Sequence, residues 1–251
     1  MTADASEHER HNRAFWDDDA DAYQAAHGHA LRAAPAAWGV WRIPESELGV
    51  LGDVKGLDVL ELGCGAAQWS IALVPLGARV TGFDQSVVQL AHAASDAHDA
   101  GVGLPLVAGG AEHLPFADRS FDLVFCDHGA LSFADPAVAL PEAARVLRAG
   151  GRLVFCHATR WAYVTYSEAK RRTTNRLQHS YFGPRLWEED DGTHDFVLRT
   201  DEWLRALRRA GLVVDDLVEL QAPKGAQTTY EWDARWARRW PGEQIWVAHK
   251  A

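Results

Sequence analysis

The stretch Leu57–Ser70, LDVLELGCGAAQWS, decides how the rest of the chain is expected to fold. Its first half is a short apolar run that is unsuited to an exposed helix, so it predicts a buried parallel strand. Gly63-Cys64-Gly65 then forms a tight turn, and the apolar side chains of Trp69, Leu73 and Leu76 recur at helical spacing. Strand, glycine turn and helix together predict the opening of a nucleotide-binding βαβ unit, in which glycines let backbone pass close to a ligand.

Two residues separate this unit from a dehydrogenase fingerprint. The third glycine of G-x-G-x-x-G is replaced by Gln68, and Glu61 ends the strand, where it would repel a pyrophosphate but attract an ammonium. ELGCG at 61–65 resembles motif I of the class I S-adenosylmethionine (SAM)-dependent methyltransferases, and residues 57 to about 158 resemble the rest of their SAM-binding core. The overall pattern is similar to methyltransferase type 11 proteins, including those of ubiquinone and menaquinone biosynthesis.

Composition narrows the class of protein. A chain of 251 residues with 47% hydrophobic and 24% charged residues suits one α/β domain, and the net charge of −10 argues against nucleic acid as a partner. Cys64, Cys126 and Cys156 have no paired spacing, so we expect free buried thiols and no metal. No apolar stretch is long enough to span a membrane and no signal peptide is apparent, so a cytoplasmic protein, monomeric or homodimeric, is expected.

The second expected strand, 78–83, ends at a candidate ribose ligand. Asp84 follows Gly63 by about 20 residues, the spacing at which a carboxylate meets a ribose, and GFDQS resembles the second motif of the family. Asp84 as a helix N-cap is the weaker alternative because Ser86 already occupies a capping position. Gln85 is expected beside the adenine.

The loop AEHLPF at 111–116 also resembles the family. Relatives usually carry Asp-Ala-Glu there, and the resemblance implies that this aspartate accepts from the adenine amino group. Gly110 replaces the aspartate in this chain, which leaves adenine recognition to the Ala111 backbone, Glu112 and apolar contacts. The complete set of expected cofactor-binding residues is Glu61, Gly63, Cys64, Gly65, Gln68, Asp84, Gln85, Ala111, Glu112, Asp127 and Tyr23.

An N-terminal helix is expected over 11–26, with Phe15, Trp16 and Tyr23 on its apolar face. In the family such a helix covers the cofactor as a lid, so Tyr23 either touches the methionine end of SAM or only docks the helix. Trp38 and Trp41 are expected on one side of a short helix, as a substrate wall or as core.

The fourth expected strand, 123–126, leads into Asp127-His128-Gly129. Ligands of open α/β sheets bind beyond the carboxyl ends of the strands, so His128 is a candidate general base there. The alternative is that His128 only packs against the cofactor. The candidate substrate residues are His157 after the fifth strand, Tyr163 and Tyr166 in the insertion that follows, and Trp41.

The expected fold is one doubly wound α/β domain spanning 1–251, with a seven-stranded mainly parallel sheet whose last strand is antiparallel, as the resemblance implies. The further strands are expected at 104–107, 152–156, 212–220 and 244–248. A helical lid (1–50) precedes the SAM-binding core (51–158), and a substrate-cap insertion (159–199) precedes the end of the sheet (200–251). A stripe of Trp232, Trp236 and Trp240 predicts a helix against the sheet or a dimer partner, or a substrate wall.

The expected function is transfer of the methyl group of SAM to a small molecule, with S-adenosylhomocysteine as product. Two alternatives remain open: a SAM-binding domain without activity that acts as a sensor or partner, and an NAD-dependent oxidoreductase. A nucleic-acid methyltransferase would need a basic face and an Asn/Asp-Pro-Pro-Tyr-like motif, where this chain has Asp127-His128-Gly129-Ala130.

Overall fold

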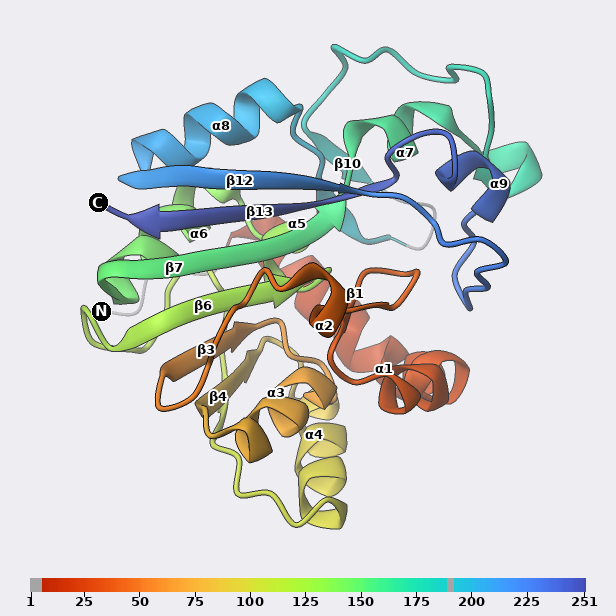
Figure 1. Cartoon of the computed structure of the whole chain (residues 1–251). Helices are drawn as coiled ribbons and strands as arrows, with labels where there is room; N and C mark the ends of the chain where they lie inside the picture. The colour runs from red at the N-terminus through yellow and green to blue at the C-terminus, as the bar shows by residue number, and fades with distance from the viewer. Residues whose placement is uncertain (1–5, 189–191) are drawn as a thin grey trace.

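The computed structural model describes residues 6–188 and 192–251 and contains a seven-stranded sheet (Figure 1). Six strands run in the same direction, and β13 runs antiparallel to both of its neighbours. The predicted doubly wound, mainly parallel sheet with an antiparallel last strand is therefore confirmed. In their order across the sheet the strands are β12 (Leu212–Leu220), β13 (Glu243–Lys250), β7 (Leu147–Ala158), β6 (Phe121–Asp127), β3 (Asp58–Leu62), β4 (Arg79–Asp84) and β5 (Leu106–Ala108).

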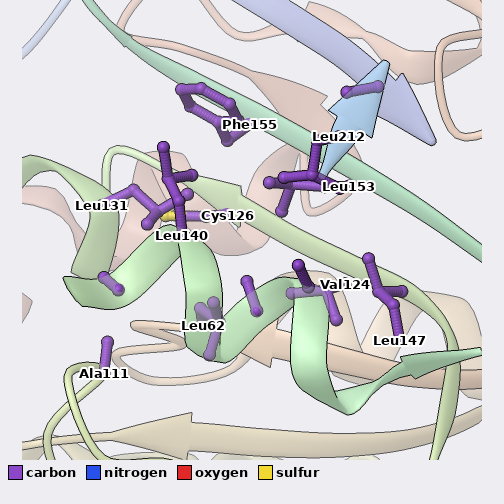
Figure 2. Close-up of a cluster of buried hydrophobic side chains, with 14 of the residues drawn as sticks. Leu62, Ala111, Val124, Cys126, Leu131, Leu140, Leu147, Leu153, Phe155 and Leu212 are labelled. Atoms are coloured by element: carbon purple, nitrogen blue, oxygen red, sulfur yellow. The ribbon is translucent and has the colours of Figure 1, made fainter. Parts of the chain in front are cut away.

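Side chains alternate between the two faces of the sheet and form two cores. Val124 and Cys126 of β6 belong to one buried cluster, which Figure 2 shows, whereas Leu123 and Phe125 of the same strand belong to the other. Both faces are apolar because helices cover both, as is usual for parallel strands. The first face packs against α5 (Ala130–Phe133), α6 (Pro136–Val146) and α8 (Thr200–Arg209), and the opposite face is covered by α3 (Gln68–Leu73), η1 (Val74–Leu76) and α4 (Val87–Asp99).

The helix α1 (Glu7–Ala33) is longer than the predicted helix over 11–26 and contacts α4, α5 and β11. It lies beside the carboxyl ends of the parallel strands, where the segments after β7 also gather (Figure 1). Those segments are α7 (Arg160–Thr165), β8 (Tyr166–Ser167), η2 (Glu168–Lys170), β9 (Arg172–Thr173), β10 (Leu186–Glu188) and β11 (His194–Phe196), and later α9 (Ala234–Ala237).

The predicted helix containing Trp38 and Trp41 is wrong. The segment is a hairpin of β1 (Ala37–Trp38) and β2 (Ile43–Pro44), followed by α2 (Glu45–Leu48). Gly39 and Arg42 both adopt positive φ in its turn, and a Cβ on Gly39 would lie 2.2 Å from Oε1 of Glu243. A glycine is needed there because β13 delivers a buried carboxylate against the turn.

The predicted aromatic helix through Trp232 and Trp240 is also wrong in extent. The helix α9 covers only Ala234–Ala237, capped by Asp233, whose side chain accepts from the Arg235 and Trp236 amides. Trp236 packs in the core as expected, whereas Trp240 is 43% exposed. The spacing of four residues between Trp232, Trp236 and Trp240 therefore does not correspond to one continuous helix.

Candidate active site

A cavity of about 300 Å³ is lined by residues at the carboxyl ends of β3, β4 and β6 and by residues of α1. This is the edge at which doubly wound sheets bind ligands. Its lining includes twelve of the residues predicted for the site, namely Tyr23, Glu61, Gly63, Cys64, Gly65, Gln68, Asp84, Gln85, Ala111, Asp127, His128 and Tyr163.

The glycine loop is held against two neighbouring loops. Gly63 has φ +72°, and a Cβ there would lie 2.2 Å from the Ala130 nitrogen, so no other residue fits without moving the loop after β6. The amides of Gly63 and Cys64 donate to the Phe83 carbonyl at 2.7 and 3.0 Å. The loop thus presents bare backbone to the cavity.

The carboxylate of Asp84 fixes this loop to the end of β4. Its Oδ2 accepts from the Gly65 amide at 2.8 Å and its Oδ1 from the Ser86 amide at 2.9 Å. Burial raises the pKa of Asp84 despite these hydrogen bonds. Ser86, not Asp84, caps α4 through its Oγ, as the sequence predicted.

Glu61 lies at the floor of the cavity and is 3% exposed. It accepts hydrogen bonds from the amide of Ser70 at 2.9 Å and from the Ser70 hydroxyl. Burial raises its pKa to about 8, and the neighbouring carboxylates Asp127 and Asp84 add to the rise. Glu61 is therefore mainly protonated near pH 7, and a cation at this position would favour its ionised form.

Asp127 is bound by groups that the sequence did not connect with it. It accepts from the Gly39 amide at 3.0 Å and from Nε1 of Trp69 at 3.1 Å, and it lies 3.8 Å from the Arg42 guanidinium. The hairpin therefore closes one side of the site.

His128 is paired with Glu243, the first residue of β13. His128 has φ +51°, and its Nε2 lies 2.6 Å from Oε1 of Glu243, which also accepts from the Val40 amide at 2.7 Å. Glu243 is fully buried, and its carboxylate can only accept hydrogen bonds, so it favours the His128 tautomer that carries the proton on Nε2. Burial alone would lower the pKa of His128, but the hydrogen bond and charge of Glu243 outweigh burial and raise it.

The part of the cavity near His128 has an aromatic wall. Hydrogen bonds of tyrosine hydroxyl groups stabilise this wall: the hydroxyl oxygens of Tyr23 and Tyr230 lie 2.6 Å apart, and the Tyr163 hydroxyl donates to the Asp195 carboxylate. This wall consists of Trp16, Tyr23, Phe133, Tyr163, Tyr230 and Trp232, and Trp69 and Phe83 also line the cavity. Of the wall residues, Tyr23 and Tyr163 were predicted for the site, and a substrate wall was an alternative for Trp232. Phe133 and Tyr230 were not predicted, because their place in the fold was not readable from periodicity.

Four predicted site residues lie outside this lining. Trp41 is buried in the core, and Tyr166 donates to Glu231 at 3.0 Å on the exposed side of the insertion. Glu112 turns away to accept from the Asp135 amide at 2.9 Å and to meet His8 at 2.5 Å. His157 does not point to the site rim as predicted; it packs against Phe155 and Trp203, since alternation along β7 directs it into the sheet core.

Asp127, His128 and Cys156 bring potential metal-ligating atoms within 4.8 Å of one another. The first two side chains are engaged as described above, and burial raises the pKa of the Cys156 thiol well above its ordinary value. A protonated thiol is a poor ligand. The expectation of a metal-free site stays a prediction.

The sheet order, the glycine loop and the acidic end of β4 define the class I SAM-dependent methyltransferase fold. Residues 60–155 match the family model described as a methyltransferase domain. A demethylmenaquinone methyltransferase of Mycolicibacterium paratuberculosis is 40% identical over 116 residues, which are 46% of this chain and 47% of the relative. The chain thus spans about half the length of the curated relatives it matches. The core of the chain is thus similar in sequence to a methyltransferase domain, and its fold is that of the class I SAM-dependent methyltransferases.

Solved structures share this fold at low sequence identity. One is a geranyl diphosphate methyltransferase in complex with GPP and sinefungin. It has a TM-score of 0.70 at 16% identity, and the match covers 98% of this chain and 100% of that one. The [4+2]-cyclase SpnF has a TM-score of 0.61 at 21% identity, covering 92% and 94%. One fold thus carries more than one named chemistry, so function must be argued from the site.

Proposed function

We propose that the protein transfers the methyl group of SAM to a small, largely apolar acceptor. The observation that carries this proposal is one cavity that joins a bare glycine loop and two carboxyl groups to an aromatic wall with a histidine. The first part suits a charged nucleoside and the second an apolar molecule. The family of the core domain and the curated relatives support the same reaction.

The residues fit SAM at each of its polar parts. The backbone of Gly63–Gly65 leaves room that a Cβ would fill, Asp84 offers carboxylate oxygens to a ribose, and Glu61 offers a carboxyl group to an ammonium. When bound, SAM supplies an electrophilic methyl group on a sulfonium. The protein then has to align the acceptor and exclude water, which the lid helix and aromatic wall would do.

His128 supplies the base if the acceptor must lose a proton. Glu243 holds Nε2 as the donor, so Nδ1 is the atom that takes the proton, and the raised pKa makes the ring a stronger base. This is the arrangement of a base oriented by a buried carboxylate. Glu243 is accordingly a positioning residue.

The acceptor class follows from the wall and from the names of similar proteins. Six aromatic rings suit a planar or isoprenoid molecule, and the relatives include methyltransferases named for demethylmenaquinone and geranyl diphosphate. Arg42 also lines the cavity, and its guanidinium, which lies 3.8 Å from Asp127, is the cation that would meet an anionic end of such a molecule. We therefore place hydroquinones and other phenols first among candidate acceptors.

The direct test is transfer of an isotope-labelled methyl group from SAM to a panel of hydroquinones, phenols and isoprenyl diphosphates. Labelled product together with stoichiometric S-adenosylhomocysteine is expected for an apolar acceptor. Tight S-adenosylhomocysteine binding with no transfer to any acceptor, and a stable protein partner, would instead favour the sensor alternative.

Other expectations remain predictions: a monomer or homodimer, no nucleic-acid partner and a cytoplasmic location. Among the described ranges 6–188 and 192–251, no helix combines the length and the apolar character needed to cross a membrane.

A further inference from the structure

The carboxylate of Glu9 occupies the space above Gly110. A Cβ built on Gly110 would lie 1.3 Å from Oε1 of Glu9, so any side chain at 110 would displace this group. Glu9 belongs to the first turn of α1, is 6% exposed and lines the cavity. Its ion pair is with Arg13, at 3.6 Å, a side chain that is 41% exposed. A buried carboxylate with a loosely bound counter-ion therefore faces the ligand cavity.

This carboxylate lies at the end of the cavity where a base would be placed. The sheet order β3-β4-β5 sets the glycine loop, Asp84 and Gly109–Ala111 side by side along the carboxyl edge. If the ribose of SAM lies at Asp84 and its methionine part lies at Glu61, the adenine occupies the strip of the cavity beyond β4, toward β5. Glu9 borders that strip.

Residues 109–112, which follow β5, offer no acceptor side chain to the base. Gly109 and Gly110 lack side chains, Ala111 is apolar, and Glu112 is turned toward His8 and the Asp135 amide. The 6-amino group of adenine is a donor and needs an acceptor when buried. The group in position to accept comes from α1, about one hundred residues earlier in the chain.

We propose that Glu9 recognises the 6-amino group of the adenine of SAM, an inference that rests on the proposed function. Cofactor recognition is then tied to the lid: the amino group finds its acceptor only when α1 is packed over β5. Gly110 is the complementary half of this arrangement, since its missing side chain makes the room that Glu9 fills.

The test compares calorimetric binding of S-adenosylhomocysteine with that of S-inosylhomocysteine, in which a 6-oxo acceptor replaces the amino donor. The wild-type protein is expected to prefer the adenosyl ligand by roughly 10- to 100-fold, the scale of a hydrogen bond to a charged group. Glu9→Gln keeps the shape of the side chain but offers an amide donor, so the preference should disappear or reverse. Glu7→Gln, an exposed position in the same helical turn, is the matched control and should keep it.

A second variant pair separates recognition from mere stabilisation of the lid. Glu9→Ala should lose the preference, and adding Gly110→Asp should restore it by returning a carboxylate to the same space. An unchanged preference in Glu9→Gln, with tight S-adenosylhomocysteine binding, overturns this inference and leaves the proposed function standing. Absence of S-adenosylhomocysteine binding in the wild-type protein overturns both.

Discussion

Nε2 of His128 lies 2.6 Å from Oε1 of Glu243, which joins the end of β6 to the start of β13 across 115 residues of sequence. Three carboxyl groups face the imidazole and raise its pKa: Glu243 from β13, Asp127 from β6 and Asp195 from β11. His157 from β7 also faces it, and the His128 ring lowers the pKa of His157. Glu243 is therefore the main reason that the ring holds its proton more tightly than burial would allow.

Glu243→Gln should lower the pKa of His128, because the amide keeps an acceptor oxygen for Nε2–H but removes the negative charge. The measurement is an NMR titration of the His128 ring in the wild-type and variant proteins. Unchanged titration midpoints would show that Glu243 does not control this histidine. His98, an exposed histidine on α4, serves as the internal reference in both spectra.

His128→Asn should reduce kcat by roughly 100-fold or more with an acceptor that must lose a proton, the usual cost of losing a general base. Asparagine is chosen because it tolerates the positive φ of this position better than alanine does. S-adenosylhomocysteine affinity should change little, which reports that the site is intact. A kcat within a few-fold of wild type would make His128 a packing residue.

Binding of S-adenosylhomocysteine at pH 7 should release protons from Glu61. The free carboxyl group has a pKa raised to about 8 by burial, and the ammonium of the ligand would favour the carboxylate. The affinity should therefore increase as the pH rises toward 8. Calorimetry in buffers of different ionisation enthalpy measures the release, which should approach about one proton. Glu61→Gln should release none; equal release by both proteins would contradict the ammonium contact.

His157 should make the protein sensitive to acid. Burial lowers its pKa to about 3, so below about pH 6.5 the unfolded chain takes up a proton that the folded protein refuses. The free energy of unfolding should then fall by about 1.4 kcal/mol per pH unit from this group. Urea titrations at pH 7.5 and 5.5 should show a loss in the wild-type protein that exceeds the loss in His157→Gln by about that amount. Equal losses would contradict the assignment.

Local sequence was enough to predict the centre of this site. The glycine loop, Asp84 and Ser86 lie within one βαβ unit, where strand ends and helix caps follow from short-range pattern. The sheet and its antiparallel last strand came from the resemblance of that unit and of the segments after it. Gly63, Asp84 and Asp127, which lie at the ends of parallel strands, therefore line the cavity as expected, even where the bounds of the strands differed.

The residues that complete the site come from far along the chain. Glu243 reaches the turn after β1 across 203 residues, and its only sequence signal is a charge at the start of an apolar strand. Gly39 and Gly110 matter because each leaves room for a carboxylate from another element, which no local pattern reveals. His157 was misplaced because its direction depends on strand register, and a shift of one residue reverses the face.

The most direct test of the account is calorimetric titration of the wild-type protein and Asp84→Ala with S-adenosylhomocysteine and, separately, with NAD. Because Asp84 holds the glycine loop and is proposed to bind the ribose, we expect S-adenosylhomocysteine binding that weakens by roughly tenfold or more in the variant, with no NAD binding by either protein. Binding of NAD alone, or no binding of S-adenosylhomocysteine by the wild-type protein, would contradict it.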